Sequence, residues 1–186
     1  SSMTTPVIIL LVAVGILILW IISIFNRLIS LRNRADEAWS DIDVQMKRRY
    51  DLIPNLIETV KGYASHESQL FENVTKARSE AMQAKSGADH ARAENMLTDT
   101  MKSLFAVAEN YPQLQASQNF LHLQQELTDA EDKIQAARRF FNSNARDLNT
   151  AIQVFPSNVI AGILSFKPRE FFDAPEAVHQ VPKVKF

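Results

Sequence analysis

The chain has 186 residues and a net charge of −1, with 20 basic and 21 acidic side chains. Acidic and basic residues are interleaved, which excludes the clustered positive surface of a nucleic-acid-binding protein and is typical of solvated helix faces. Hydrophobic residues make up 46% of the chain but are concentrated at the N-terminal end. The lack of cysteine is compatible with either side of a membrane and decides nothing.

The first predicted element is an apolar segment from Val7 to Phe25, in which Ser23 is clearly polar. A helix of about 20 residues crosses the ~30 Å of hydrocarbon in a bilayer, so we expect a single transmembrane helix. A cleaved signal peptide is the alternative, but no Lys or Arg precedes the segment and no small-residue cleavage site follows it. Ser1 and Ser2 resemble a cloning remnant, and residues 1–6 form a short tail. The predicted span includes Val7, Leu11, Gly15, Leu19, Ile22 and Phe25.

Orientation follows from the basic residues that flank this span. Arg27, Arg32 and Arg34 come directly after it, and no Lys or Arg comes before it. The excess of positive charge predicts that the C-terminal side lies in the cytoplasm. A periplasmic or extracellular location is the alternative.

A long helical stripe follows the span and predicts one side of a helical bundle. Its apolar positions recur with a mean spacing of about 3.6 residues, the period of an α-helix. Pro54 lies within it and predicts a kink near residues 50–53, because proline lacks the backbone N–H and clashes with the preceding turn. The stripe consists of Leu28, Leu31, Ala35, Ala38, Ile42, Met46, Tyr50, Ile53, Ile57, Val60 and Ala64.

Two further long helices are expected. The second runs from about His66 to Glu109, with Ser65 as its N-cap and an alternative break into two helices near Gly87. The third begins after a turn at Pro112 and ends at Pro156, with apolar residues at the alternating spacing that favours coiled-coil packing. Helices of similar length joined by short turns predict an all-α fold: an elongated antiparallel three-helix bundle over residues 26–155, or four helices if the second breaks.

The C-terminal segment, residues 156–186, is apolar and ends in an alternating, extended-looking stretch at 181–186. Too many large apolar residues follow residue 154 for a solvated tail, so we predict an interface for self-association. Its candidate residues are Phe155, Ile160, Ile163, Phe166, Phe171 and Phe172.

Residues capable of chemistry are present, but they form no recognisable active site. Glu176 and His179 have the spacing found in di-metal bundles, yet one copy is too few, so no metal or cofactor is expected. The carboxylates of the first and third helices, and the basic clusters 47–49 and 138–139, are interpreted as surface charge. Asp51, Asn55, Asn110 and Tyr111 are conceivable groups of a membrane-bound hydrolase, but they lack a defined nucleophile, base and orienting group.

Several long stretches together resemble one family of bacterial membrane proteins. They are RNRADEAWSDIDVQMKRRYDLIPNLIETVKGYASHE, FENVTKARSEA, AENYPQLQASQNFLHLQQEL, DKIQAARRFFNSNARDLNTAIQVFPSNVIAG, KPREFF and the final KVKF. In this order they resemble the LemA family over nearly the whole chain after the apolar segment. The resemblance implies a small bacterial protein of the inner membrane with one transmembrane helix and a long helical bundle. It brings no established enzymatic activity, although some members are associated with magnetosome formation.

These observations predict a non-enzymatic scaffold, anchored in the membrane, that self-associates and organises lipid or partner proteins. Homo-oligomers and contacts with membrane lipid are expected, with no nucleic acid and no identified small-molecule substrate. A signalling or receptor stalk is the alternative, since fold alone does not fix function.

Overall fold

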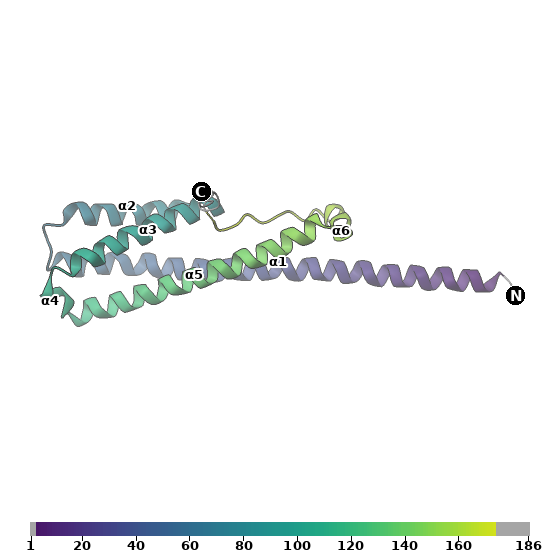
Figure 1. Cartoon of the computed structure of the whole chain (residues 1–186), viewed down its shortest axis with the longest axis horizontal. Coiled ribbons are helices and arrows are strands. Elements are labelled where there is room, and N and C mark those ends of the chain that lie inside the picture. The colour runs from purple at the N-terminus through teal and green to yellow at the C-terminus, as the bar shows by residue number, and fades with distance from the viewer. Residues whose placement is uncertain (1–2, 174–186) are drawn as a thin grey trace, which may run out of the picture. The chain divides into compact units, whose positions relative to one another are not determined.

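A computed structural model describes residues 3–173, most of which are helical, with no strand among them (Figure 1). The expectation of an all-α fold with a long apolar helix at the N-terminus is confirmed. The helices are α1 (Thr4–Lys61), α2 (Ser68–Gln83), α3 (Gly87–Ala108), α4 (Pro112–Gln115), α5 (Gln118–Gln153) and α6 (Ser157–Ile163).

The chain forms two compact units, and α1 and α5 each contribute to both. Among the described residues, the first unit consists of residues 3–37 and 143–169, and the second of residues 38–142 and 170–173. The predicted division at residues 26 and 156 is based on sequence character, and it stays a prediction.

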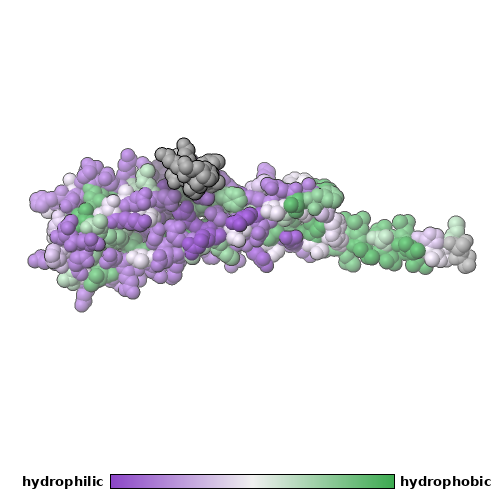
Figure 2. Space-filling view, in the orientation of Figure 1, coloured by the Kyte–Doolittle hydropathy of each residue, from purple (hydrophilic) through white to green (hydrophobic). Residues whose placement is uncertain are grey.

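The first unit contains the apolar part of α1. This helix is long and apolar enough to cross a membrane, with a mean hydropathy of 3.3 over its most apolar window, and none of that window is buried within the protein. Figure 2 shows the resulting hydrophobic surface. Further along α1, a small core joins it to the end of α5 and to α6. The buried residues of this core are Leu28, Leu31, Leu148, Ala151, Ile160 and Ala161.

The second unit is built from the C-terminal half of α1, from α2 and α3, and from the larger part of α5. Within it, successive long helices run in opposite directions (Figure 1). Side-chain hydrogen bonds join α1 to α2, α3 and α5, so the four segments pack around one core. Every residue of the predicted stripe from Leu28 to Ala64 is buried, which confirms the period inferred from sequence.

The single helix expected between His66 and Glu109 is interrupted, because residues 84–86 separate α2 from α3. Ser86 is the N-cap of α3, and its hydroxyl accepts a hydrogen bond from the backbone N–H of Asp89 at 3.1 Å. Gly87 is buried beneath the C-terminal segment, where a Cβ atom would lie 2.3 Å from the carbonyl oxygen of Phe171. The glycine that weakens the helix therefore also lets another part of the chain approach its backbone.

Other boundaries differ from expectation in smaller ways. Ser65 does not cap a helix, because α2 begins later and its N-cap, Glu67, makes no side-chain capping bond. Pro112 begins a helix as predicted, but α4 ends at Gln115 and the long helix α5 starts at Gln118. The stop expected near Pro156 is confirmed, because α5 ends at Gln153. The extended stretch 181–186 lies outside the described residues.

Helix α1 continues through Pro54, and the bend predicted there stays a prediction. In a regular helix the N–H of residue 54 would donate to the carbonyl oxygen of Tyr50, and proline has no N–H to give. The guanidinium of Arg78 in α2 donates its Nε–H to that carbonyl oxygen at 2.7 Å. A side chain from a neighbouring helix therefore satisfies the acceptor that Pro54 leaves free.

We expect Arg78→Met to destabilise the protein by about 1–3 kcal/mol, because a part-buried carbonyl oxygen then loses its partner. In a Pro54→Ala background the same substitution should cost less, since the new N–H of residue 54 can donate to Tyr50. The measurement is a double-mutant cycle by chemical denaturation of the full chain in detergent. Arg92→Met, which changes an exposed arginine on α3, is the control. Equal costs of Arg78→Met in both backgrounds would contradict this account.

Candidate functional site

A buried ionic cluster joins three helices in the centre of the second unit. The Arg49 guanidinium on α1 pairs with the Glu94 carboxylate on α3 and with the Glu131 carboxylate on α5. The side chains of Arg49 and Glu94 are 2% and 1% exposed, whereas that of Glu131 is 26% exposed. Two hydroxyl groups complete the cluster: Tyr50 donates to Glu94, and Thr98 donates to Glu131 and accepts a hydrogen bond from Arg49 at 3.0 Å.

Burial raises the pKa of the Tyr50 phenol, and the negative charge of Glu94 raises it further. Tyr50 is therefore a neutral hydrogen-bond donor at physiological pH. The guanidinium and carboxylates partner one another, as buried charges must because desolvation is otherwise too costly. Apart from the Nε–H of Arg49, which is buried without a hydrogen-bond partner among the described residues, these groups satisfy one another. The cluster is therefore suited to fixing the helices in one register.

The cluster corrects the interpretation of residues 47–49 as surface charge, since Arg49 is a core residue. Two signals in the sequence could have found it. Arg49 lies between Met46 and Ile53 at the same three-and-four spacing as the buried stripe, and Glu94 lies three residues after buried Ala91. A basic residue and an acidic residue at stripe positions of two helices are candidates for pairing across a core.

Arg48, next in the chain to Arg49, makes the surface counterpart of this cluster. Its guanidinium contacts the carboxylates of Glu126 at 2.5 Å and Asp129 at 2.8 Å, both on α5. These hydrogen bonds lower the pKa of both carboxyl groups and raise the pKa of Arg48. Glu126 and Asp129 are partly exposed in these pairs, which agrees with their interpretation as surface charge.

A cavity of about 150 Å³ lies beside the ionic cluster and is lined by residues of α1, α3 and α5, including Arg49, Thr98 and Glu131. Sites for small molecules usually measure about 300–1,000 Å³. The cavity is small for a metabolite, and two of its charged side chains, Arg49 and Glu131, are paired with each other.

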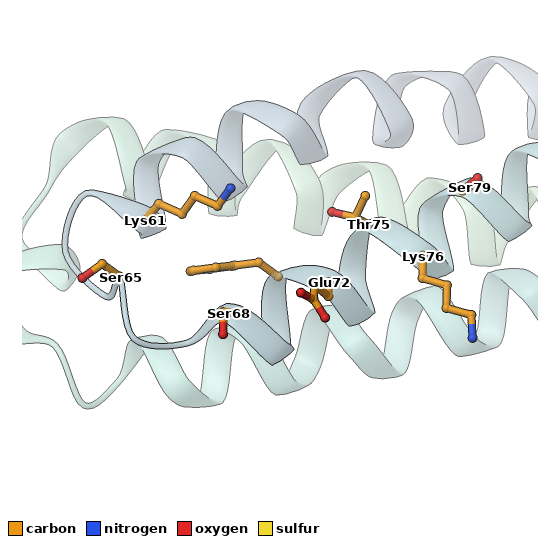
Figure 3. Close-up of a pocket in the computed structure, with 8 residues that line it drawn as sticks. Lys61, Ser65, Ser68, Glu72, Thr75, Lys76 and Ser79 are labelled. Atoms are coloured by element: carbon orange, nitrogen blue, oxygen red, sulfur yellow. The ribbon is translucent and has the colours of Figure 1, made fainter.

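A larger and more open groove of about 610 Å³ runs along the end of α1 and the start of α2. Figure 3 shows its side chains spread along the helix without converging on one point. Lys61 lies over the ring of Phe71, with its Nζ 5.7 Å from the ring centroid. Its serines, lysines and Glu72 are spread along the groove and do not converge as the nucleophile, base and orienting group of a hydrolytic site must. It is lined by Lys61, Ser65, Ser68, Phe71, Glu72, Thr75, Lys76 and Ser79.

The four conceivable hydrolase residues do not form a site. Asp51 and Asn55 are exposed on α1, and Asn110 is exposed in the turn after α3. The Tyr111 hydroxyl hydrogen-bonds to the Glu67 carboxylate at 3.2 Å. None of the four lines the groove of Figure 3.

Two asparagines of α5 hold the segment that follows α6. In the second unit, the Asn142 side-chain amide accepts from the N–H of Phe172 at 2.8 Å and donates to its carbonyl oxygen at 3.1 Å. In the first unit, Asn149 makes the same pair of bonds with the backbone of Arg169, at 2.7 and 2.9 Å. Each amide therefore satisfies both backbone groups of one residue, as a neighbouring strand would.

Aromatic packing adds to the Asn142 clamp. The ring of Phe172 is fully buried and lies 5.8 Å from Trp39 and 6.0 Å from His90, measured between ring centroids. Arg138 covers Phe172 with its guanidinium 4.7 Å from the ring centroid, and burial lowers the pKa of Arg138. The interpretation of Arg138 as plain surface charge is therefore wrong, whereas Arg139 is exposed as expected.

The predicted self-association interface is divided by the fold. Ile160 and Phe172 are buried inside the protein, and Phe166 is half-buried against the core of the first unit. These three are not free to contact a second copy, because helices and loops of the same chain already cover them. Phe155, Ile163 and Phe171 remain exposed, at 80%, 76% and 41%.

An apolar groove of about 410 Å³ lies in the first unit between α1 and α6. Trp20 and Ile21 contribute from α1, and the rest of its lining comes from the turn between α5 and α6, from α6 itself and from the residue after it. Every side chain in the lining is apolar. The remaining lining residues are Phe155, Pro156, Val159, Ile160, Ile163 and Leu164.

Among residues 3–173, no group of three or more His, Cys, Asp or Glu side chains is placed to hold a metal ion. The pair Glu176 and His179 lies outside the described residues.

The protein thus combines a long apolar helix with a helical bundle that contains a buried ionic cluster. This combination defines a class of all-helical proteins equipped for membrane attachment. Comparison with family models gives the particular family: residues 38–186 match the LemA family, and the chain belongs to it.

Similar proteins come from several bacteria. The magnetosome protein MamQ of Magnetospirillum gryphiswaldense is 25% identical over 80% of this chain and 64% of its own length. MamQ 2 of Paramagnetospirillum magneticum is 24% identical, over 82% of this chain and 66% of its own length. Protein LemA of Metamycoplasma hominis is 26% identical, over 81% of this chain and 69% of its own length. The chain thus spans just under two thirds of the MamQ proteins that it matches.

We expect Arg49→Met to destabilise the full chain by about 3–5 kcal/mol, because it leaves the buried Glu94 carboxylate without its cation. Replacing both partners, as Arg49→Met with Glu94→Leu, should cost less than Arg49→Met alone, since the one carboxylate then left without its cation is that of Glu131, which is 26% exposed and partly solvated. Chemical denaturation in detergent, followed by circular dichroism, measures both. Arg48→Met is the matched control and should cost about 1 kcal/mol or less, as for other exposed pairs. Equal losses for Arg48→Met and Arg49→Met would show that burial of the cluster does not matter.

Proposed function

We propose that this protein is a single-pass, membrane-anchored helical scaffold that self-associates and organises membrane or partner proteins, without enzymatic activity. The observation that carries the proposal is the continuity of α1, which extends from Thr4 to Lys61 without a break. Its N-terminal part is exposed and apolar, and its C-terminal part supplies a buried stripe of the helical bundle.

The internal pairing of the polar core supports a structural role. The charges of the buried cluster are paired with one another, Arg49 with Glu94 and Glu131. The large groove near Lys61 has no convergent catalytic groups. Similarity to proteins named for the magnetosome agrees with the link to magnetosome formation that the family resemblance implies. These points favour a scaffold over a hydrolase.

Self-association is tested with the full chain in lipid nanodiscs, by measuring particle mass over a range of protein-to-lipid ratios. The expected result is that discs carry two or more copies more often than random loading predicts. The variant Phe171→Ser removes one exposed apolar side chain of the predicted interface. Its control is Val44→Ser, which removes an exposed apolar side chain of α1 outside that interface. Random loading at every ratio would overturn self-association.

Orientation is a separate proposal: the bundle lies in the cytoplasm of a bacterial cell, on the side of Arg27, Arg32 and Arg34. Protease added to intact spheroplasts should leave the bundle uncut, and detergent lysis should expose it. Digestion of the bundle before lysis would place it on the outer face instead.

A further inference from the structure

Helix α6 has two apolar faces, and one of them has no cover in the protein. Ile160 and Ala161 are buried in the core of the first unit. On the other face, Val159 and Ile163 are 51% and 76% exposed, and Phe155, in the turn just before α6, is 80% exposed. A contiguous apolar patch of this kind is unusual where a protein faces water. It marks a contact with an apolar partner or solvent.

The position of this surface, beside the apolar part of α1, indicates that the apolar phase is the lipid bilayer. The groove beside α6 is completed by Trp20 and Ile21, which belong to the apolar span itself. Figure 2 shows hydrophobic surface both on α6 and on the neighbouring part of α1. If the span crosses a bilayer, then any groove that Trp20 and Ile21 line is at the depth of the acyl chains or at their boundary.

The distribution of charged residues also separates a membrane-contacting part of the first unit from a part that faces water. The first charged residue after the span is Arg27, six positions beyond Ile21 and therefore about 9 Å further along the helix axis. No charged residue occurs between Asp147 and Lys167, so α6 and its flanks can enter an apolar layer without burying a charge. Arg32 and Lys167 are exposed, and the Arg32 guanidinium lies 5.0 Å from the centroid of the Phe166 ring. These cations are suited to contact anionic headgroups.

We propose that α6 is a second membrane-contacting element: its exposed face and the groove beside Trp20 are occupied by lipid acyl chains, while Arg27, Arg32 and Lys167 contact the headgroups. The proposal rests on the membrane anchoring proposed above. It assigns lipid as the partner of the exposed face of α6, where the sequence predicts self-association. A short apolar helix packed beside a spanning helix widens the attachment from one helix to a wedge in one leaflet.

The lack of cysteine in the chain allows a direct test with single-cysteine variants of the full protein, each labelled with an environment-sensitive fluorophore. Ile163→Cys and Val159→Cys report on α6. Ile16→Cys, on the exposed part of the span, is the positive control, and Met82→Cys, on exposed α2, is the negative control. Each protein is reconstituted into vesicles of phosphatidylcholine and phosphatidylglycerol, with or without bromine on the acyl chains.

Bromine quenches fluorophores that contact acyl chains. The expected result is quenching of the labels at positions 159 and 163 to an extent similar to that at position 16, with none at position 82. Quenching at position 16 but not at 159 or 163 would overturn the α6 proposal and leave the anchor intact. No quenching at position 16 would instead overturn the anchor, and the α6 proposal with it.

A second copy of the chain is the competing occupant. In that case the labels on α6 would move to blue-shifted emission without bromine quenching, and neighbouring cysteines at position 163 would cross-link. That outcome also overturns the lipid proposal. Arg32→Gln with Lys167→Gln provides an independent readout: it should weaken the dependence of α6 quenching on phosphatidylglycerol and leave quenching at position 16 unchanged.

Discussion

One guanidinium aligns three helices of the second unit, α1, α3 and α5. Arg49 carries a charge that cannot stay unpaired in the core, so α1 must be aligned with Glu94 on α3 and with Glu131 on α5. An apolar stripe alone tolerates sliding by a turn, because one aliphatic contact can replace another. A charge with two carboxylate partners tolerates no such shift. The hydrogen bonds of the Tyr50 and Thr98 hydroxyls further restrict the alignment of the helices.

Much of this arrangement could be predicted, and the reason is periodicity. The stripe from Leu28 to Ala64 follows the helical repeat and is buried at every position. Charges were harder to assign, because Arg48 and Arg49 are neighbours with the same chemistry and opposite environments. Arg48 is part-exposed and pairs with Glu126 and Asp129, whereas Arg49 is buried. The difference depends on partners that lie more than 40 residues away in the sequence, and single-helix patterns do not contain that information.

The C-terminal segment shows a second limit of sequence reasoning. Its phenylalanines indicate correctly that an apolar contact exists, but not whether the contact lies within the chain or outside it. Phe172 is buried because Asn142 holds its backbone and because Gly87 leaves room for Phe171 to approach α3. Asparagines in helices are usually interpreted as polar surface. Here two of them, Asn142 and Asn149, replace the backbone partners that an extended segment needs.

The same competition between partners explains the two faces of α6. Burial of Ile160 and Ala161 fixes the helix against α1 and α5, so the spacing of an α-helix directs Val159 and Ile163 to the opposite side. Phe155, in the turn before α6, is exposed as well. That side adjoins Trp20 and Ile21, residues whose own exposure is acceptable only in an apolar solvent. The exposure of α6 and the exposure of the span therefore have one physical explanation. A bilayer removes both apolar surfaces from water at once, and a second protein copy docked on α6 would still leave the span to be covered.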